Sequence, residues 1–163
     1  MAFAVQPVVH ADAKGLATTL TSAWYENPHW RFRFEDPSLE RLTYYNSQRI
    51  PWNLVRGRAE KRHQKVIDVE TGEVVGYARW LLPPTLAEKN VWPEAAVAEP
   101  SPEDRDLFEK KFQAAANSNG DMPGTKTNGM TAFRSRPLEE ADSRIMKDGP
   151  YLGKLQALPT RWK

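Results

Sequence analysis

The stretch KVIDVETGEVVGYARWLL, residues 65–82, constrains the fold more than any other part of the sequence. Two runs rich in Val, Ile, Tyr and Trp flank the polar ETGE, and such runs favour β-strands. Gly72 can supply the positive backbone angle that a tight turn needs. We therefore predict an antiparallel hairpin. Gly76, inside the second run, weakens a strand by itself and so indicates a bulge or the close approach of another backbone.

The N-terminal segment predicts a strand followed by a helix. Residues 3–9, FAVQPVV, alternate well enough for a short strand, in which Pro7 belongs at an edge or a bulge because it has no amide hydrogen. In residues 11–24 the apolar side chains recur at three- and four-residue steps, which gives a helix one apolar stripe. Pro28 predicts that this helix ends near Asn27.

A second helix is predicted to begin at DPSLERL. Asp36 would be its N-cap, and Pro37 would occupy the first helical position, where a missing amide hydrogen costs nothing. Pro51 is predicted to end or kink this helix at about Ile50.

Between the two helices lies HWRFRFED, which alternates aromatic and basic residues. Two interpretations stay open. The segment can be a loop that tucks Trp30, Phe32 and Phe34 into the core. It can also supply stacking and phosphate contacts to single-stranded nucleic acid, although Glu35 and Asp36 argue against that use.

The second half of the chain predicts a Pro/Gly-rich insertion, residues 83–136, with one helix. That helix is expected at SPEDRDLFEKKF, with Ser101 as its cap and Pro102 in its first turn. NSNGDMPGTKTNG, residues 117–129, predicts a mobile loop. A further helix is predicted over residues 137–149, and YLGKLQAL, residues 151–158, predicts a last strand.

Length and composition favour a single folded domain, residues 1–163. With 163 residues, 40% hydrophobic and 27% charged, the chain has enough apolar surface to bury a core. The net charge of only +2, with acidic and basic residues interspersed, makes nucleic acid an unlikely partner. The absence of cysteine excludes disulfides and thiolate chemistry. We expect a cytoplasmic protein, because no leader pattern or run of ~20 apolar residues is present.

Tests for known catalytic motifs find none. GDMPGTKT, residues 120–127, fails as a phosphate-binding loop because Thr125, not glycine, precedes the lysine. The histidines His10, His29 and His63 are far apart in the sequence, so we expect no metal site. No Gly-x-Ser-x-Gly sequence is present either.

Three segments together resemble the GNAT superfamily of N-acetyltransferases, in particular the N-terminal part of its fungal members. The segment from residue 3 to residue 32 looks like the opening strand, the Asp-Ala helix start and the Asn-Pro turn. The hairpin is similar to the second and third strands, with a Gly-Glu-x-x-Gly-aromatic-Ala-x-Trp pattern in Gly72, Glu73, Gly76, Tyr77, Ala78, Arg79 and Trp80. The last stretch looks like the fourth strand, with matches at Tyr151, Leu152, Leu155 and Pro159.

The resemblance implies an α+β fold. It would be an incomplete GNAT-like mixed sheet of about four strands, with helices packed on it and a helical insertion before the last strand. In that family acetyl-CoA is the cofactor and acetyl passes directly to a substrate amine, which would be a small molecule or a peptide here. The resemblance places the substrate between the first two helices and the central strands, with Trp30, Phe34 and Trp80 as its walls. It places the acyl arm of the cofactor along the backbone of Leu155, Ala157 and Leu158.

The sequence departs from the family after the fourth strand. There the family has a Gln/Arg-x-x-Gly-x-Gly/Ala loop, whose amides and helix dipole bind the cofactor's pyrophosphate. PTRWK stands in that place here, and the family's later catalytic tyrosine has no matching position. We therefore expect a C-terminally truncated N-acetyltransferase-like domain that is inactive on its own. The alternative is a non-enzymatic module that associates with itself or a protein partner through the open edge of the fourth strand.

Overall fold

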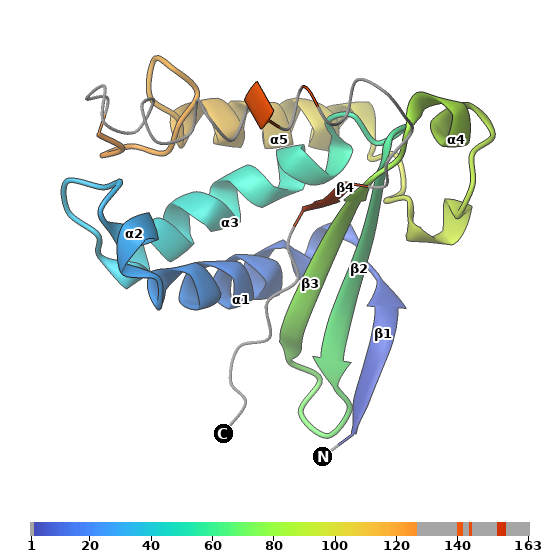
Figure 1. The fold of residues 1–163 in the computed structure, drawn as a ribbon, viewed down its shortest axis with the longest axis horizontal. Helices are drawn as coiled ribbons and strands as arrows, with labels where there is room; N and C mark the ends of the chain where they lie inside the picture. The colour runs from blue at the N-terminus through green and yellow to red at the C-terminus, as the bar shows by residue number, and fades with distance from the viewer. Residues whose placement is uncertain (1, 127–139, 142–143, 145–152, 156–163) are drawn as a thin grey trace.

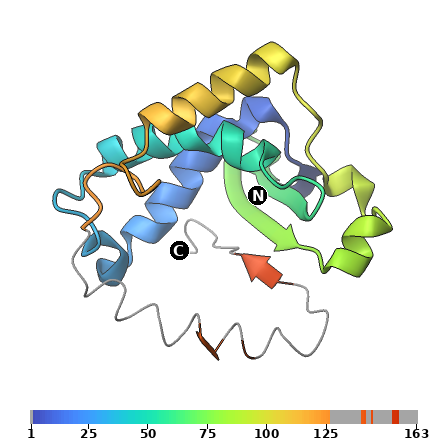
Figure 2. The ribbon, with the colours of Figure 1, turned by 90° about the horizontal axis from the view of Figure 1, so that it is seen from above.

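A computed structural model describes residues 2–126, 140, 141, 144 and 153–155. The fold is α+β, with one antiparallel sheet and a layer of helices against it (Figure 1). Viewed from above, α1, α3 and α5 lie on one side of the described strands (Figure 2). Helix α1 packs on both β3 and α3, and α5 packs on α3.

The described strands follow the order β1-β2-β3-β4. Their bounds are Phe3–Pro7 for β1, Lys61–Asp68 for β2, Val74–Leu81 for β3 and Gly153–Leu155 for β4. Every pairing among them is antiparallel, so the described strands include no parallel pair. Strand β4 is short and pairs with the end of β3, from Arg79 to Leu81. The predicted hairpin is confirmed as β2 and β3.

Both glycines of the hairpin have the roles that the sequence indicates. Gly72 turns the chain with φ of 72°. Val66 faces Gly76 and Ile67 faces Val74, so Val75 is the extra residue of a β-bulge. A Cβ atom on Gly76 would lie 3.2 Å from the Cβ of Val66, which shows how closely the two strands approach there.

The predicted N-terminal strand and helix are also confirmed. After the short 3-10 helix η1 (His10–Asp12), helix α1 spans Ala13–Tyr25. Its apolar stripe includes the fully buried Leu16 and Ala17, which join the main core. The hydroxyl of Thr19 donates a hydrogen bond to the backbone oxygen of Val74, and this bond fixes α1 on β3.

The second predicted helix begins later than expected. Helix α3 spans Leu39–Val55, and its N-cap is Ser38, whose hydroxyl accepts from the amide of Arg41. Asp36 instead pairs through its carboxylate with the guanidinium of Arg41, 3.0 Å away. The prediction of Asp36 as N-cap is therefore wrong, because Ser38 has the extended backbone and the hydroxyl position that a cap requires.

Pro51 was predicted to end or kink this helix near Ile50. The predicted end is wrong, because α3 continues through Pro51 to Val55. A proline inside a helix costs about 3 kcal/mol. Ile50 and Leu54 on either side of it are buried in the core, and full burial of such a side chain contributes about 1.5–3 kcal/mol. The buried apolar face therefore offsets the lost backbone hydrogen bond.

The remaining described helices are short, apart from α5. Their bounds are Pro28–Arg31 for α2, Pro84–Glu88 for α4, Pro93–Ala95 for the 3-10 helix η2 and Pro102–Ala114 for α5. The predicted cap of α5 is confirmed, since the Ser101 hydroxyl accepts from the Asp104 amide at 3.0 Å. The insertion therefore holds α4 and η2 in addition to the one helix that was predicted.

Some predictions fall wholly or partly outside the described residues. Of the helix predicted over residues 137–149, only 140, 141 and 144 are described, and these are helical. Of the last strand, Gly153–Leu155 is described, whereas Ala157 and Leu158 are not. In the part of the chain that the structure describes, no helix has the length and hydropathy needed to cross a membrane.

Candidate functional site

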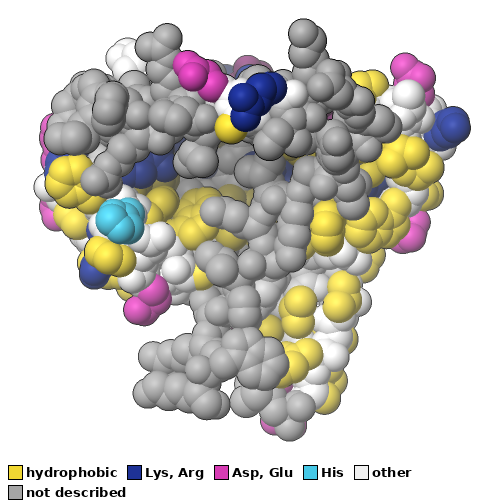
Figure 3. All heavy atoms as spheres, viewed as in Figure 1, with side chains coloured by type: hydrophobic (Ala, Val, Ile, Leu, Met, Phe, Trp, Pro, Cys, Tyr) yellow, Lys and Arg dark blue, Asp and Glu magenta, His cyan; other side chains and the backbone are white. Residues whose placement is uncertain are grey.

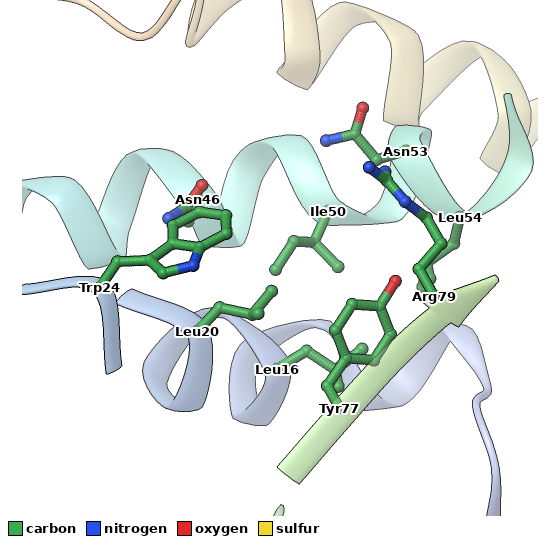
Figure 4. A pocket seen from close by; sticks show the side chains of 9 residues that line it. All are labelled: Leu16, Leu20, Trp24, Asn46, Ile50, Asn53, Leu54, Tyr77 and Arg79. Atoms are coloured by element: carbon green, nitrogen blue, oxygen red, sulfur yellow. The ribbon is translucent and has the colours of Figure 1, made fainter. Parts of the chain in front are cut away.

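A pocket of about 80 Å³ lies between α1, α3 and β3 (Figure 4). Each of the three elements contributes side chains to its wall. The lining residues are Leu16, Leu20 and Trp24 from α1, Asn46, Ile50, Asn53 and Leu54 from α3, and Tyr77 and Arg79 from β3. The pocket thus has an aliphatic interior with polar groups at several points of its wall.

The β3 residues enter the pocket because alternate side chains of a strand point to the same face. Tyr77 and Arg79 are two residues apart, and both lie on the face covered by α1 and α3. In Figure 4 the guanidinium of Arg79 extends toward α3, where Asn53 lies, and the hydroxyl of Tyr77 points in the same general direction.

Two hydrogen-bond donors at the pocket have no partner among the described residues. They are Nε of Arg79 and Nε1 of Trp24, and both atoms are buried. An unsatisfied buried donor costs about 1–3 kcal/mol, and more when the group is charged. Such groups mark places where a ligand or an ordered water can supply the missing acceptor.

Behind Tyr77 lies a buried histidine. Nδ1 of His63, on β2, is 2.7 Å from the hydroxyl oxygen of Tyr77, and the two rings are stacked with centroids 5.9 Å apart. Burial, together with the smaller effect of the nearby charges of Arg79, Lys61 and Arg62, lowers the pKa of His63 to about 3. Burial also raises the pKa of Tyr77 above its ordinary value. Both groups are therefore neutral at physiological pH.

A buried ion pair stands next to this histidine along β2. Nζ of Lys65 lies 2.6 Å from a carboxylate oxygen of Asp12, and both side chains are largely shielded from solvent. Lys65 is paired with Tyr77 across the hairpin, so the ion pair lies on the same face of the sheet. The second oxygen of Asp12 accepts from the amide of Val9. The ion pair with Lys65 therefore joins η1 to β2.

The three residues predicted as substrate walls do not line this pocket. Trp30, on α2, packs against Trp24 with ring centroids 5.6 Å apart, and against Phe34 at 4.8 Å. Trp30 therefore packs against Trp24, which lines the pocket, without lining the pocket itself. Phe34 is 3% exposed and belongs to the core. The resemblance implies a substrate between the first two helices and the central strands, and the pocket lies in that general region, between α1, α3 and β3.

Trp80 is on the other face of β3. It directly follows Arg79, so the alternation of the strand points its side chain to the opposite face from Tyr77 and Arg79. Its ring packs on Trp92, with centroids 6.0 Å apart, and its Nε1 donates to the side-chain oxygen of Gln64 at 3.3 Å. Of the predicted cofactor residues, Leu155 pairs with Arg79 across β3 and β4, whereas Ala157 and Leu158 lie outside the described residues.

The HWRFRF segment has a mixed environment. The core interpretation is right for Phe34 and wrong for Phe32, which is 52% exposed and lies under Nζ of Lys126, 4.4 Å from its ring centroid. The guanidinium of Arg31 lies over the ring of Tyr25 at 5.2 Å. Both cations therefore pack on aromatic rings of the chain itself, and the nucleic-acid interpretation stays a prediction.

Sequence reasoning missed Trp24, Tyr77 and Arg79 as pocket residues. The signal was the alternation in GYARW, which separates Tyr77 and Arg79 from Trp80, together with the position of Trp24 on the apolar stripe of α1. Among the described residues, no three His, Asp or Glu side chains come together in a group that could hold a metal ion. Comparison with protein-family models, with curated proteins and with solved structures finds no match to this chain.

Proposed function

We propose that the chain is an N-acetyltransferase-like protein and that the pocket between α1, α3 and β3 is its acceptor site. The position of the pocket carries this proposal, because the resemblance places the substrate between the first two helices and the central strands. The order of strand, helix, helix and hairpin, with a helical insertion before the next strand, gives further support.

Acetyl-CoA is the donor that the resemblance implies. In the reaction the C–S bond of the thioester breaks, a C–N bond to the amine forms, the amine loses a proton and the CoA sulfur gains one. Strand β4 brings the backbone of Leu155 beside Arg79, which is a pocket residue. This position suits the acyl arm, which the resemblance assigns to Leu155, Ala157 and Leu158.

The pocket offers no effective general base. No aspartate or glutamate is among its lining residues. The pKa of His63, at about 3, makes that histidine a weak proton acceptor at neutral pH. In addition, the 163 residues contain no Gln/Arg-x-x-Gly-x-Gly/Ala sequence for the pyrophosphate. We therefore propose that this polypeptide binds the acceptor and does not transfer acetyl by itself.

Two measurements on the 163-residue protein test the proposal. NMR spectra of the ¹⁵N-labelled chain are recorded with a panel of small primary amines and their N-acetyl derivatives, and release of free CoA from acetyl-CoA is followed with the same panel. The proposal expects some panel members to shift the indole N–H signal of Trp24 without any release of CoA. A panel in which no compound shifts this signal contradicts the acceptor site. Micromolar binding of acetyl-CoA, or turnover, contradicts the proposed inactivity.

A second candidate function is a non-enzymatic interaction module. It is favoured by the place of β4 at the end of the sheet order, with no described strand beyond it. At the opposite edge, Phe3 and Val5 of β1 are 48% and 64% exposed. The space-filling view shows hydrophobic side chains at the surface of the part of the sheet that the structure describes (Figure 3). Light scattering tests this function, because a clean monomer at high concentration that recruits no partner counts against it.

A further inference from the structure

We propose that the pocket between α1, α3 and β3 binds a small carboxylate, held by the guanidinium of Arg79. This binding site stands on the geometry of the pocket. The consequence for chemistry rests on the proposed function: if the bound molecule is the acceptor, its class is a small amino acid, which carries both a carboxylate and an amine.

The first argument is the chemistry of the Arg79 guanidinium. Arg79 lines the pocket, and its buried Nε has no acceptor among the described residues. A guanidinium presents its N–H groups in a planar fork that matches the two oxygens of a carboxylate. The indole of Trp24 lies at the opposite end of the pocket (Figure 4) and takes no part in this contact.

The second argument is the sign of the charge around the pocket. Arg79 is the one charged residue among those that line it, and no ion pair among the described residues neutralises it. The cations Arg79, Lys61 and Arg62 all act on the neighbouring His63. This field attracts an anion and repels an ammonium group placed at the same point. The amine of an amino acid would therefore have to face away from Arg79.

The third argument is size. A cavity needs about 10–15 Å³ to hold one water, and this pocket has about 80 Å³. It therefore has room for a group of several heavy atoms and no more. The aliphatic side chains of Leu16, Leu20 and Ile50 give a short carbon chain an apolar surface. Propionate, with a carboxylate and two further carbons, has the required size and charge.

The probes are propionate, propylamine and propionamide, which share a carbon skeleton and differ in charge. Each is titrated into the 163-residue protein without acetyl-CoA, and the Trp24 indole and Arg79 Nε–H signals are followed by NMR. We expect a Kd of about 1 mM for this ligand of five heavy atoms. We expect propionate to bind and propylamine not to bind. Propylamine binding as tightly as propionate would overturn the proposal.

Variants separate the site from general charge effects. Arg79→Gln is expected to abolish propionate binding, because it removes the guanidinium that holds the carboxylate. Arg105→Gln removes a cation whose side chain pairs with Glu99 outside the pocket, and should leave binding unchanged. Arg79→Lys serves as the test if the glutamine variant does not fold, because lysine keeps the positive charge but lacks the planar set of N–H donors. Unchanged affinity in folded Arg79→Gln or Arg79→Lys would overturn the proposal.

These experiments distinguish failure of the carboxylate site from failure of the proposed acceptor role. Propionate binding with no response to any amine or N-acetyl compound would leave the carboxylate site standing and remove the acceptor role. Acceptor binding by amines without a carboxylate, together with no binding of propionate, would leave the acceptor role and overturn the carboxylate site.

Discussion

The hydroxyl of Tyr77 and Nδ1 of His63 are 2.7 Å apart, in a hydrogen bond that joins the two strands of the hairpin beneath the pocket. His63 is almost fully buried, and its other ring nitrogen, Nε2, has no partner among the described residues. Among the described side chains, Tyr77 is therefore the one that forms a hydrogen bond with the His63 ring. The bond positions the phenol, which in turn forms part of the pocket wall.

Tyr77→Phe should destabilise the protein by about 1–3 kcal/mol. The variant keeps the ring but removes the hydroxyl, and so it leaves Nδ1 of His63 buried without a partner. Urea denaturation measures the change in the free energy of unfolding. Tyr44→Phe is the matched control, because Tyr44 is 59% exposed and its loss of a hydroxyl should change stability by less than about 0.5 kcal/mol. Equal effects of the two substitutions would contradict the role of the bond.

Acid should weaken the fold through His63. Its pKa falls from the ordinary 6.5 to about 3 on folding, so the unfolded chain binds more protons between these values. The stability from this group is therefore fully present above about pH 6.5 and is lost as the pH falls toward 3. The measurement is the free energy of unfolding against pH for the wild type and His63→Gln. The variant should show a shallower slope in this window, and His29→Gln, at an exposed histidine, should retain the wild-type slope.

Asp12→Asn should destabilise the protein by about 3 kcal/mol, because it leaves the buried ammonium of Lys65 without its counter-ion. Adding Lys65→Met to this variant should restore a large part of the loss, since the unpaired charge is then gone. The exposed pair Lys110 and Asp106 is the control, and Asp106→Asn should have no measurable effect. Thermal unfolding of the four proteins measures both results. A double variant no more stable than Asp12→Asn would contradict the explanation.

Local patterns predicted the described fold well where one signal dominated. The hairpin followed from its β-rich runs and Gly72, and α1 followed from its apolar stripe. The start of α3 was predicted wrongly, because Asp36 and Ser38 are both good caps and only the backbone conformation separates them. Pro51 was predicted wrongly because the burial of Ile50 and Leu54, which holds the helix together across it, depends on tertiary contacts.

The pocket was harder to predict than the fold. Its general position agrees with the resemblance, but its lining depends on which face of β3 meets α1 and α3. The resemblance implied Trp80 as a wall residue, but the alternation of the strand turns its side chain away from the pocket. The partnership of His63 and Tyr77 joins residues on two strands, and only the register of the hairpin brings them together.

The most direct test of the central claim is the location of bound propionate by intermolecular NOEs in the ¹³C-labelled protein. If the pocket between α1, α3 and β3 is the ligand site, the methyl protons of propionate will show NOEs to the methyl groups of Leu16 and Ile50. NOEs only to exposed residues such as Val5, or no NOEs at saturating propionate, would contradict the claim.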